Sequence, residues 1–404
     1  MLDQIHIRNY KSLRDVALDL RPFNVLIGPN NAGKSNVFDC LRLLSELTRS
    51  QQGEPVQSRG GFSSIVWNGE IKSSIGIEIS GHEPSFADQH GDRYRFKYDV
   101  HLAGGPTHFQ IASERFWAED ALPEAGAMSH IEKDLLKARP QGRVLLEYPV
   151  EQQNMARATD PSGKVVWTGG YGLGLSSYLL PFADPTRFPL VGDFALQVKN
   201  WAFYNFVPSL MEAPLAVRKD VRLQERGENF GAVLHSYHAE FGPNFREIEE
   251  WLRRAMPEIS SLLTGLTEGG QTFAQIEESG LKVRIPSWSM SDGTIRFLAH
   301  LLVVFGASPP PLVCFEEPEN YIHPHLLELL AHVLKKASTR SQILLTTHSP
   351  YLLNFLEPED IIVVEKHAGA TEVTRTKEQG AIKEALQTLG LGEIWYAGSL
   401  GGTP

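Results

Sequence analysis

The most constraining feature of this 404-residue chain is a glycine-rich octapeptide, Gly28–Ser35, which fits the pattern G-x-x-x-x-G-K-[ST]. The apolar run Phe23–Ile27 precedes it and reads as a buried strand. After it, apolar residues recur at helical spacing, so we expect a helix to begin close to Ser35. A strand, a tight turn and a helix in this order predict a loop that wraps phosphate groups.

Each residue type in the octapeptide suits that chemistry. Gly28 and Gly33 let the backbone turn its N–H groups toward phosphates, and Lys34 would reach the β- and γ-phosphates. The hydroxyl of Ser35 would hold Mg²⁺. The sequence therefore predicts ATP and Mg²⁺ as ligands, with Asn30 and Asn31 as further nucleotide-binding residues of the same loop.

Two further segments place polar groups directly after apolar strands. Leu312–Phe315 is followed by Glu316 and Glu317, and a later apolar strand is followed by His348. In a nucleotide site Glu316 would bind the Mg²⁺ shell, Glu317 would activate water and His348 would lie near the γ-phosphate. The alternatives are exposed acids at a strand end and a structural histidine.

The order of predicted elements indicates an α/β fold. Strands and helices alternate from residue 289 to 366, which favours a parallel sheet covered by helices on both faces. We expect a head made of residues 1–50 and 286–404. An insertion over 51–285 would be β-rich at 71–190 and helical at 225–265, with helical spacing that runs on to Leu263.

The charge and apolar content of the chain limit the kinds of partner that we expect. The formal net charge of −10 argues against a surface that binds polyanions everywhere, but it permits one basic groove. The densest basic cluster comprises Arg218, Lys219, Arg222 and Arg226. We interpret it as a solvated surface, and the alternative is a contact to a phosphate backbone. With no apolar run of about 20 residues and no leader, we expect a cytoplasmic protein without a membrane partner.

The motifs together resemble a known family. The phosphate loop, Ser289–Thr294, the acidic strand with Pro318–Asn320 and Thr347–Pro350 follow in the order found in ABC-type ATPases. They are most similar to the RecF, SMC and OLD-like branch, and within it to stand-alone OLD-like predicted ATPases. The resemblance implies a P-loop NTPase fold with a mixed sheet flanked by helices.

That resemblance also implies roles. Lys34 and Ser35 would bind phosphate and Mg²⁺, Glu317 would be the hydrolytic carboxylate and His348 the switch histidine. Ser291 and Gly293 would contact the γ-phosphate held by a second copy, which implies a homodimer or higher oligomer. Two positions depart from the pattern, because Glu316 stands where Asp is usual and Ser-Asp-Gly-Thr replaces Ser-Gly-Gly-Gln.

For function, we expect an ATP-driven dimer that acts as a molecular switch in DNA repair or anti-phage defence. Too little chain follows His348 for a nuclease domain, so a nuclease-like effector would be a separate protein, with DNA as a further partner. The alternatives are the ATPase subunit of a transporter and a non-hydrolysing scaffold. The glutamine that touches Mg²⁺ in the family stays open among Gln51, Gln52 and Gln57, and His323 and His325 offer only a weak metal pattern.

Overall fold

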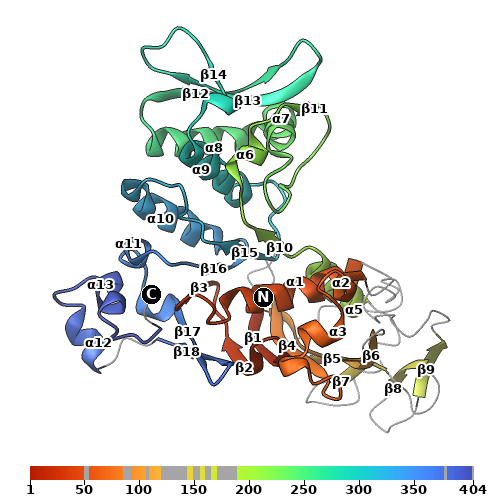
Figure 1. The fold of residues 1–404 in the computed structure, drawn as a ribbon. Helices are drawn as coiled ribbons and strands as arrows, with labels where there is room; N and C mark the ends of the chain where they lie inside the picture. The colour runs from red at the N-terminus through yellow and green to blue at the C-terminus, as the bar shows by residue number, and fades with distance from the viewer. Residues whose placement is uncertain are drawn as a thin grey trace. The chain divides into compact units, whose positions relative to one another are not determined.

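The computed structural model describes residues 1–49, 54–84, 92–105, 109–119, 143–148, 155–159, 165–170, 189–376 and 380–402. The chain forms two compact units (Figure 1). The first comprises Met1–Arg21, Pro29–Trp201 and Val364–Arg375, and the second comprises Pro22–Gly28, Ala202–Val363 and Thr376–Pro404. In the described ranges, no helix is both long and apolar enough to cross a bilayer.

The first unit is built on an antiparallel sheet with the order β2-β1-β4-β5-β6-β7-β8-β9. Side chains alternate in it as expected for a sheet with one packed face, since Ile5 and Ile7 are buried and their neighbours are not. Its strands are β1 Leu2–Tyr10, β2 Leu13–Asp19, β4 Ile75–Pro84, β5 Asp92–Gly104, β6 Phe109–Glu119, β7 Arg143–Tyr148, β8 Met155–Thr159 and β9 Val165–Gly170. The predicted β-rich segment thus does contain antiparallel strands.

Helices and one further strand complete this unit. The long helix α1 buries an apolar stripe, and Phe194 of α5 packs against the rings of Phe96, Tyr98 and Phe116. The elements are α1 Lys34–Arg49, α2 Glu54–Gln57, α3 Phe62–Ile65, the 3₁₀ turn η1 Trp67–Gly69, α5 Pro189–Lys199 and β18 Ala370–Arg375. The helix predicted near Ser35 is confirmed, because α1 begins one residue earlier.

The second unit contains the predicted parallel sheet. Its strands lie in the order β10-β15-β16-β3-β17, and every neighbouring pair is parallel. Their bounds are β10 Ala202–Tyr204, β15 Leu312–Glu316, β16 Gln342–Thr346, β3 Phe23–Ile27 and β17 Ile361–His367, whose last residues belong to the first unit. Strands β3, β15 and β16 are apolar runs because both faces of the sheet are buried.

Helices and a small antiparallel sheet surround that parallel sheet. The core includes most of α9, from Thr294 to Val304, packed with α8 and α10. The elements are α6 Pro208–Met211, β11 Leu215–Ala216, α7 Phe230–Glu240, α8 Gly242–Ala255, β12 Ile259–Leu266, β13 Gln271–Glu278, β14 Ile285–Pro286, η3 Ser287–Ser289, α9 Asp292–Val304, η4 Pro324–Leu326, α10 Leu327–Ala337, α11 Pro350–Leu353, η5 Pro358–Asp360, α12 Gly380–Ala385 and α13 Leu391–Tyr396.

One expectation about secondary structure is wrong. The spacing of apolar residues predicts a helix up to Leu263, but α8 ends at Ala255 and β12 begins at Ile259. Pro257 explains the end of the helix, since its ring restricts the preceding residue to extended conformations. The following residues then pair antiparallel with β13, a strand that local periodicity did not predict.

Candidate functional site

The glycine-rich loop has the backbone that its sequence predicted. Gly28, Asn31 and Gly33 all have positive φ, at 146°, 63° and 114°. Such angles are accessible to glycine and tolerated by asparagine, and they turn successive N–H groups in a way that a regular strand or helix cannot. The loop leads directly into the first turn of α1, so its backbone has the form of an anion-binding loop.

Gly33 is required by packing as well as by φ. A Cβ atom at this position would lie 2.1 Å from Oγ1 of Thr371 on β18 and 2.9 Å from Oγ of Ser12. The Thr371 hydroxyl donates to the carbonyl oxygen of Ala32 over 2.7 Å and lies 2.7 Å from the Ser12 hydroxyl. Asn36 also donates a hydrogen bond to the Ser12 hydroxyl over 2.7 Å. The loop is therefore fixed by side chains from β18 and from the β1–β2 turn.

The side chains of the loop divide into buried and exposed groups. Lys34 is 6% exposed, and its ammonium group donates to the carbonyl oxygen of Pro29 over 3.0 Å. Asn30, Asn31 and Ser35 are exposed. A buried cation curled over its own loop, beside an exposed hydroxyl, is an arrangement suited to a polyphosphate and its metal.

A half-buried ionic cluster ties the β1–β2 hairpin to α1, and sequence reasoning did not find it. The Asp39 carboxylate accepts hydrogen bonds from Tyr10, Lys11 and Arg59, and Arg59 also pairs with Glu46. Burial alone would raise the pKa of Asp39, but the bonds from Lys11 and Tyr10 and the charge of Arg59 outweigh it and lower that pKa. The carboxylate thus stays charged and holds the hairpin against the helix that follows the loop.

In the second unit, three parallel strands end at one edge. Glu316, the last residue of β15, lies opposite Thr346 of β16, and Thr346 lies opposite Leu26 of β3. The carboxyl ends of these strands are therefore adjacent, and β3 continues into Gly28 at the start of the glycine-rich loop. Ligands of open α/β sheets bind at this kind of edge.

Glu317 is held in an unusual conformation at that edge. Its φ of 45° lies in the left-handed region, which is unfavourable for a residue with a long side chain. Its N–H donates to the carbonyl oxygen of Thr346 over 3.0 Å, and its own carbonyl accepts from Arg296 over 2.7 Å. Asn320 donates to carboxylate Oε2 over 2.6 Å, and Nε2 of His348 lies 3.9 Å from Oε1. The structure thus brings the two predicted catalytic side chains together.

Glu316 has a partner that sequence reasoning missed. The amide of Asn205, which follows β10, donates to Oε2 of Glu316 over 3.1 Å. The register of β10 places Tyr204 opposite Phe315, so Asn205 comes level with Glu316. None of the motifs found in the sequence includes Asn205. Asn205 orients the carboxylate that we predicted to serve the metal.

Arg296 links helix α9 to the loop that follows β15. Its guanidinium donates to the carbonyl oxygens of Phe206 and Glu317, each over 2.7 Å, and lies over the ring of Tyr321. Burial lowers the pKa of Arg296, against the opposing charges of Glu319 and Glu317. The helix α9 is thereby bonded to the backbone of Glu317.

The segment Ser291–Thr294, which we call the signature because its counterpart in ABC-type ATPases contacts the γ-phosphate of a second copy, lies at the start of α9. Ser291 caps this helix, since its hydroxyl accepts from the N–H of Thr294 over 3.1 Å, and the residue is exposed. A Cβ atom at Gly293 would lie 2.6 Å from the carbonyl oxygen of Tyr321, so only glycine fits there. The signature therefore packs on the loop that follows Glu317.

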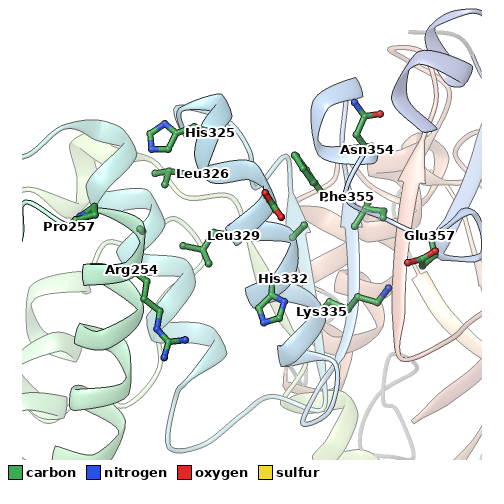
Figure 2. A pocket seen from close by; sticks show the side chains of 14 residues that line it. Arg254, Pro257, His325, Leu326, Leu329, His332, Lys335, Asn354, Phe355 and Glu357 are labelled. Carbon is green, nitrogen blue, oxygen red and sulfur yellow. The ribbon is translucent and has the colours of Figure 1, made fainter. Parts of the chain in front are cut away.

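A groove of about 910 Å³ lies elsewhere in the second unit, lined by residues of α8, α10 and the segment after α11 (Figure 2). Arg254, His332, Lys335 and Phe355 border it (Figure 2), whereas Lys34, Ser35, Glu316, Glu317 and His348 are not among its lining residues. His325 also lines it, and its Nδ1 lies 2.6 Å from Nδ1 of His323. Among the residues that the structure describes, no group of three or more potential ligands could hold a metal ion.

The remaining predicted residues are placed as follows. Gln57 ends α2 in the first unit, whereas Gln51 and Gln52 lie outside the described residues. In the basic cluster, Arg218 pairs with Asp220 and Lys219 with Glu240, while Arg222 donates to Ser308. These internal bonds fit the solvated-surface interpretation of that cluster.

Comparison with one solved structure shows the fold of this chain. The chain is similar to the SMC head bound to the C-winged helix domain of ScpA, with 13% identity, a TM-score of 0.54 and coverage of 92% of this chain and 97% of that one. A second similar structure is the Smc head domain with an extended coiled coil from Pyrococcus furiosus, with 12% identity, a TM-score of 0.49 and coverage of 96% and 98%. No curated protein matches the chain.

A family model also matches. It is described as "AAA domain, putative AbiEii toxin, Type IV TA system" and covers residues 23–354, from the strand before the glycine-rich loop to the segment after His348. The range that it matches includes the glycine-rich loop with its positive φ angles and most of the chain that shares the fold of the SMC head. The chain therefore belongs to this family of AAA domains and has the fold of an SMC head.

Proposed function

We propose that this protein is an ATP-hydrolysing molecular switch that acts in DNA repair or anti-phage defence through a separate effector. Two copies would close on Mg²⁺-ATP and separate after hydrolysis. The observation that carries the proposal is Glu317, whose backbone is held by Arg296 and Thr346 while its carboxylate lies 3.9 Å from the His348 ring. A protein that only bound ATP for assembly would have no need of this arrangement.

The residues available for ATP fit the ligand. The backbone of the glycine-rich loop and the Lys34 ammonium would hold the phosphates. For the metal, Ser35 and Glu316 offer a hydroxyl and a carboxylate, the oxygen ligands that Mg²⁺ prefers, and Asn205 fixes the carboxylate. Bound Mg²⁺ would neutralise charge on the phosphate oxygens.

Glu317 would then activate the attacking water. Asn320 donates to one of its carboxylate oxygens, and the other oxygen faces His348. We assign Oε1 as the proton acceptor, because it lies on the side of His348 while Oε2 holds the Asn320 amide. The His348 ring would orient the water or the γ-phosphate from the neighbouring strand end.

The exposed signature supports a composite site. Ser291 is exposed at the start of α9, and Gly293 is packed closely against the loop that follows Glu317. A helix N-terminus with an exposed hydroxyl suits a γ-phosphate brought by a second copy. ATP would therefore hold the dimer together, and hydrolysis would release it.

A separate effector fits the comparisons. The similar SMC head is bound to a domain of another protein, and the description of the family names a TA system. Both suggest that ATPases of this kind act with a second protein. The proposal assigns this chain the switching role and leaves the effector chemistry to its partner.

The test is Glu317→Gln, which keeps the shape of the side chain and removes its basicity. We expect turnover of Mg²⁺-ATP to fall by about 100-fold or more, with ATP affinity unchanged and a dimer that persists in size-exclusion chromatography with ATP. Glu328→Gln, an exposed acid on α10, is the matched control and should behave as wild type. Normal turnover in Glu317→Gln would refute its assignment as the catalytic base.

A further inference from the structure

We propose that Glu319 is a positioning residue. It connects the switch segment, Thr347–Ser349, to the loop of residues 317–322 and so fixes the position of His348 relative to Glu317. This inference rests on the proposed hydrolytic function. One carboxylate oxygen of Glu319 accepts two hydrogen bonds, from the Thr347 hydroxyl over 2.6 Å and from the N–H of His348 over 3.1 Å. His348 is thus bonded through its own backbone to the loop that carries Glu317.

Further hydrogen bonds hold the switch segment in place. The Thr347 hydroxyl gives its single proton to Glu319 and accepts the N–H of Ser349 over 3.0 Å. The N–H of Thr347 donates to the carbonyl oxygen of Leu26 at the end of β3. Three consecutive residues therefore depend, directly or through one hydroxyl, on a single carboxylate oxygen.

The other side of the link is equally well defined. The N–H of Asn320 donates to the Glu317 carbonyl over 3.1 Å, and the N–H of Ile322 donates to the Glu319 carbonyl over 3.0 Å. These two turns, with the Asn320 amide on the Glu317 carboxylate, make residues 317–322 a compact loop. A displacement of Glu319 would therefore alter the 3.9 Å separation of His348 and Glu317.

The second carboxylate oxygen of Glu319, Oε2, bears on whether this residue positions His348 or transfers protons. Oε2 is shielded from solvent and has no hydrogen-bond partner among the described residues. Burial raises the pKa of this carboxyl, and the nearby Glu317 charge adds to the effect, against the bonds from Thr347 and His348. The hydrogen bonds that the structure gives this carboxylate are therefore the two that Oε1 accepts.

This role predicts an unusual pattern of substitutions. Glu319→Gln keeps an oxygen that can accept both hydrogen bonds, so kcat should stay within about three-fold of wild type. Glu319→Met removes the acceptor at similar length, and kcat should fall by about ten- to 100-fold while ATP affinity is retained. Thr347→Val removes only the hydroxyl at constant shape and should lower kcat in the same direction. Glu328→Met, at an exposed site, is the matched control.

A spectroscopic measurement keeps the proposal testable without turnover. In protein labelled with ¹⁵N-histidine, the His348 amide signal is assigned by its loss in His348→Gln. We expect that signal to move in Glu319→Met and in Thr347→Val, and to stay close to its wild-type position in Glu319→Gln. If wild type hydrolyses no ATP, the proposed function fails, but this measurement still decides the role of Glu319.

Two results would overturn the inference. If Glu319→Gln stops turnover as completely as Glu317→Gln, Glu319 takes part in proton transfer. If Thr347→Val and a folded Glu319→Met both keep wild-type kcat and an unshifted His348 amide, the link does not position the histidine. Melting temperatures measured beside kcat would show whether a lost activity reflects unfolding.

Discussion

The hydroxyl of Thr371 donates a hydrogen bond to the carbonyl oxygen of Ala32, so a strand near the end of the chain supports the glycine-rich loop near its beginning. Sequence reasoning could not find this contact, because Thr371 is more than 300 residues from the loop and belongs to no motif. It explains why the loop keeps its shape around Gly33, whose missing side chain leaves room for the threonine.

Removing that hydroxyl should weaken ATP binding. In Thr371→Val the carbonyl of Ala32 loses its donor and Ser12 loses a partner, while the branched shape stays. The loss of one buried hydrogen bond of about 1 kcal/mol predicts a Kd for ATP raised about five-fold. Titration with a fluorescent ATP analogue measures it. Thr371→Ser keeps the hydroxyl and should bind normally, and equal affinity in all three proteins would contradict the role of Thr371.

Lys34→Ala should abolish nucleotide binding at ordinary concentrations. The substitution removes a buried cation from a loop that must hold several negative charges, and we expect affinity to fall by about 100-fold or more. Equilibrium binding of labelled ATP is the measurement, with exposed Lys72→Ala as the control. Wild-type affinity in Lys34→Ala would rule out the assignment of Gly28–Ser35 as the phosphate-binding loop.

The sequence predicted what depends on local pattern. The glycine-rich loop, the start of α1 and the parallel strands that end at Glu316 and Thr346 follow from periodicity and motif order. The partners of those residues could not be predicted, because they depend on strand pairing over long distances. Asn205 reaches Glu316 only because β10 pairs with β15, a register that nothing in either segment specifies.

A buried histidine should make stability depend on pH. Burial, and secondarily the charge of Arg296, lowers the pKa of His300 to about 3, and its ring packs against Phe206 and Phe315. Below the ordinary value of 6.5 the unfolded chain binds a proton that the folded chain does not, so stability falls as pH falls from about 6.5 toward 3. The contribution approaches about 1.4 kcal/mol per pH unit.

Urea unfolding between pH 6.5 and 4.5 measures that dependence. His300→Asn can still donate to the Arg296 carbonyl but does not titrate, so its loss of stability over this range should be smaller than that of wild type. The comparison subtracts the contributions of carboxyl groups common to both proteins. Identical pH dependence in both would show that His300 is accessible to protons in the folded state.

The last prediction separates an ABC-type dimer from a P-loop enzyme that works alone. If Ser291 and Gly293 serve the nucleotide held by Lys34 of another copy, a subunit defective in one set can be complemented by a subunit defective in the other. Ser291→Arg places a large side chain where a partner's phosphate would come, and we expect it to abolish turnover while ATP binding persists.

Mixing Ser291→Arg with Lys34→Ala should therefore restore activity that neither variant has alone. Each mixed dimer contains one intact composite site, and half of the dimers in an equal mixture would be mixed, so about a quarter of wild-type turnover is the upper expectation if the sites fire independently. A covalently tethered mixed dimer raises that expectation to about a half, since every molecule then holds one intact site. Full turnover in Ser291→Arg alone would refute the signature assignment and with it the shared site.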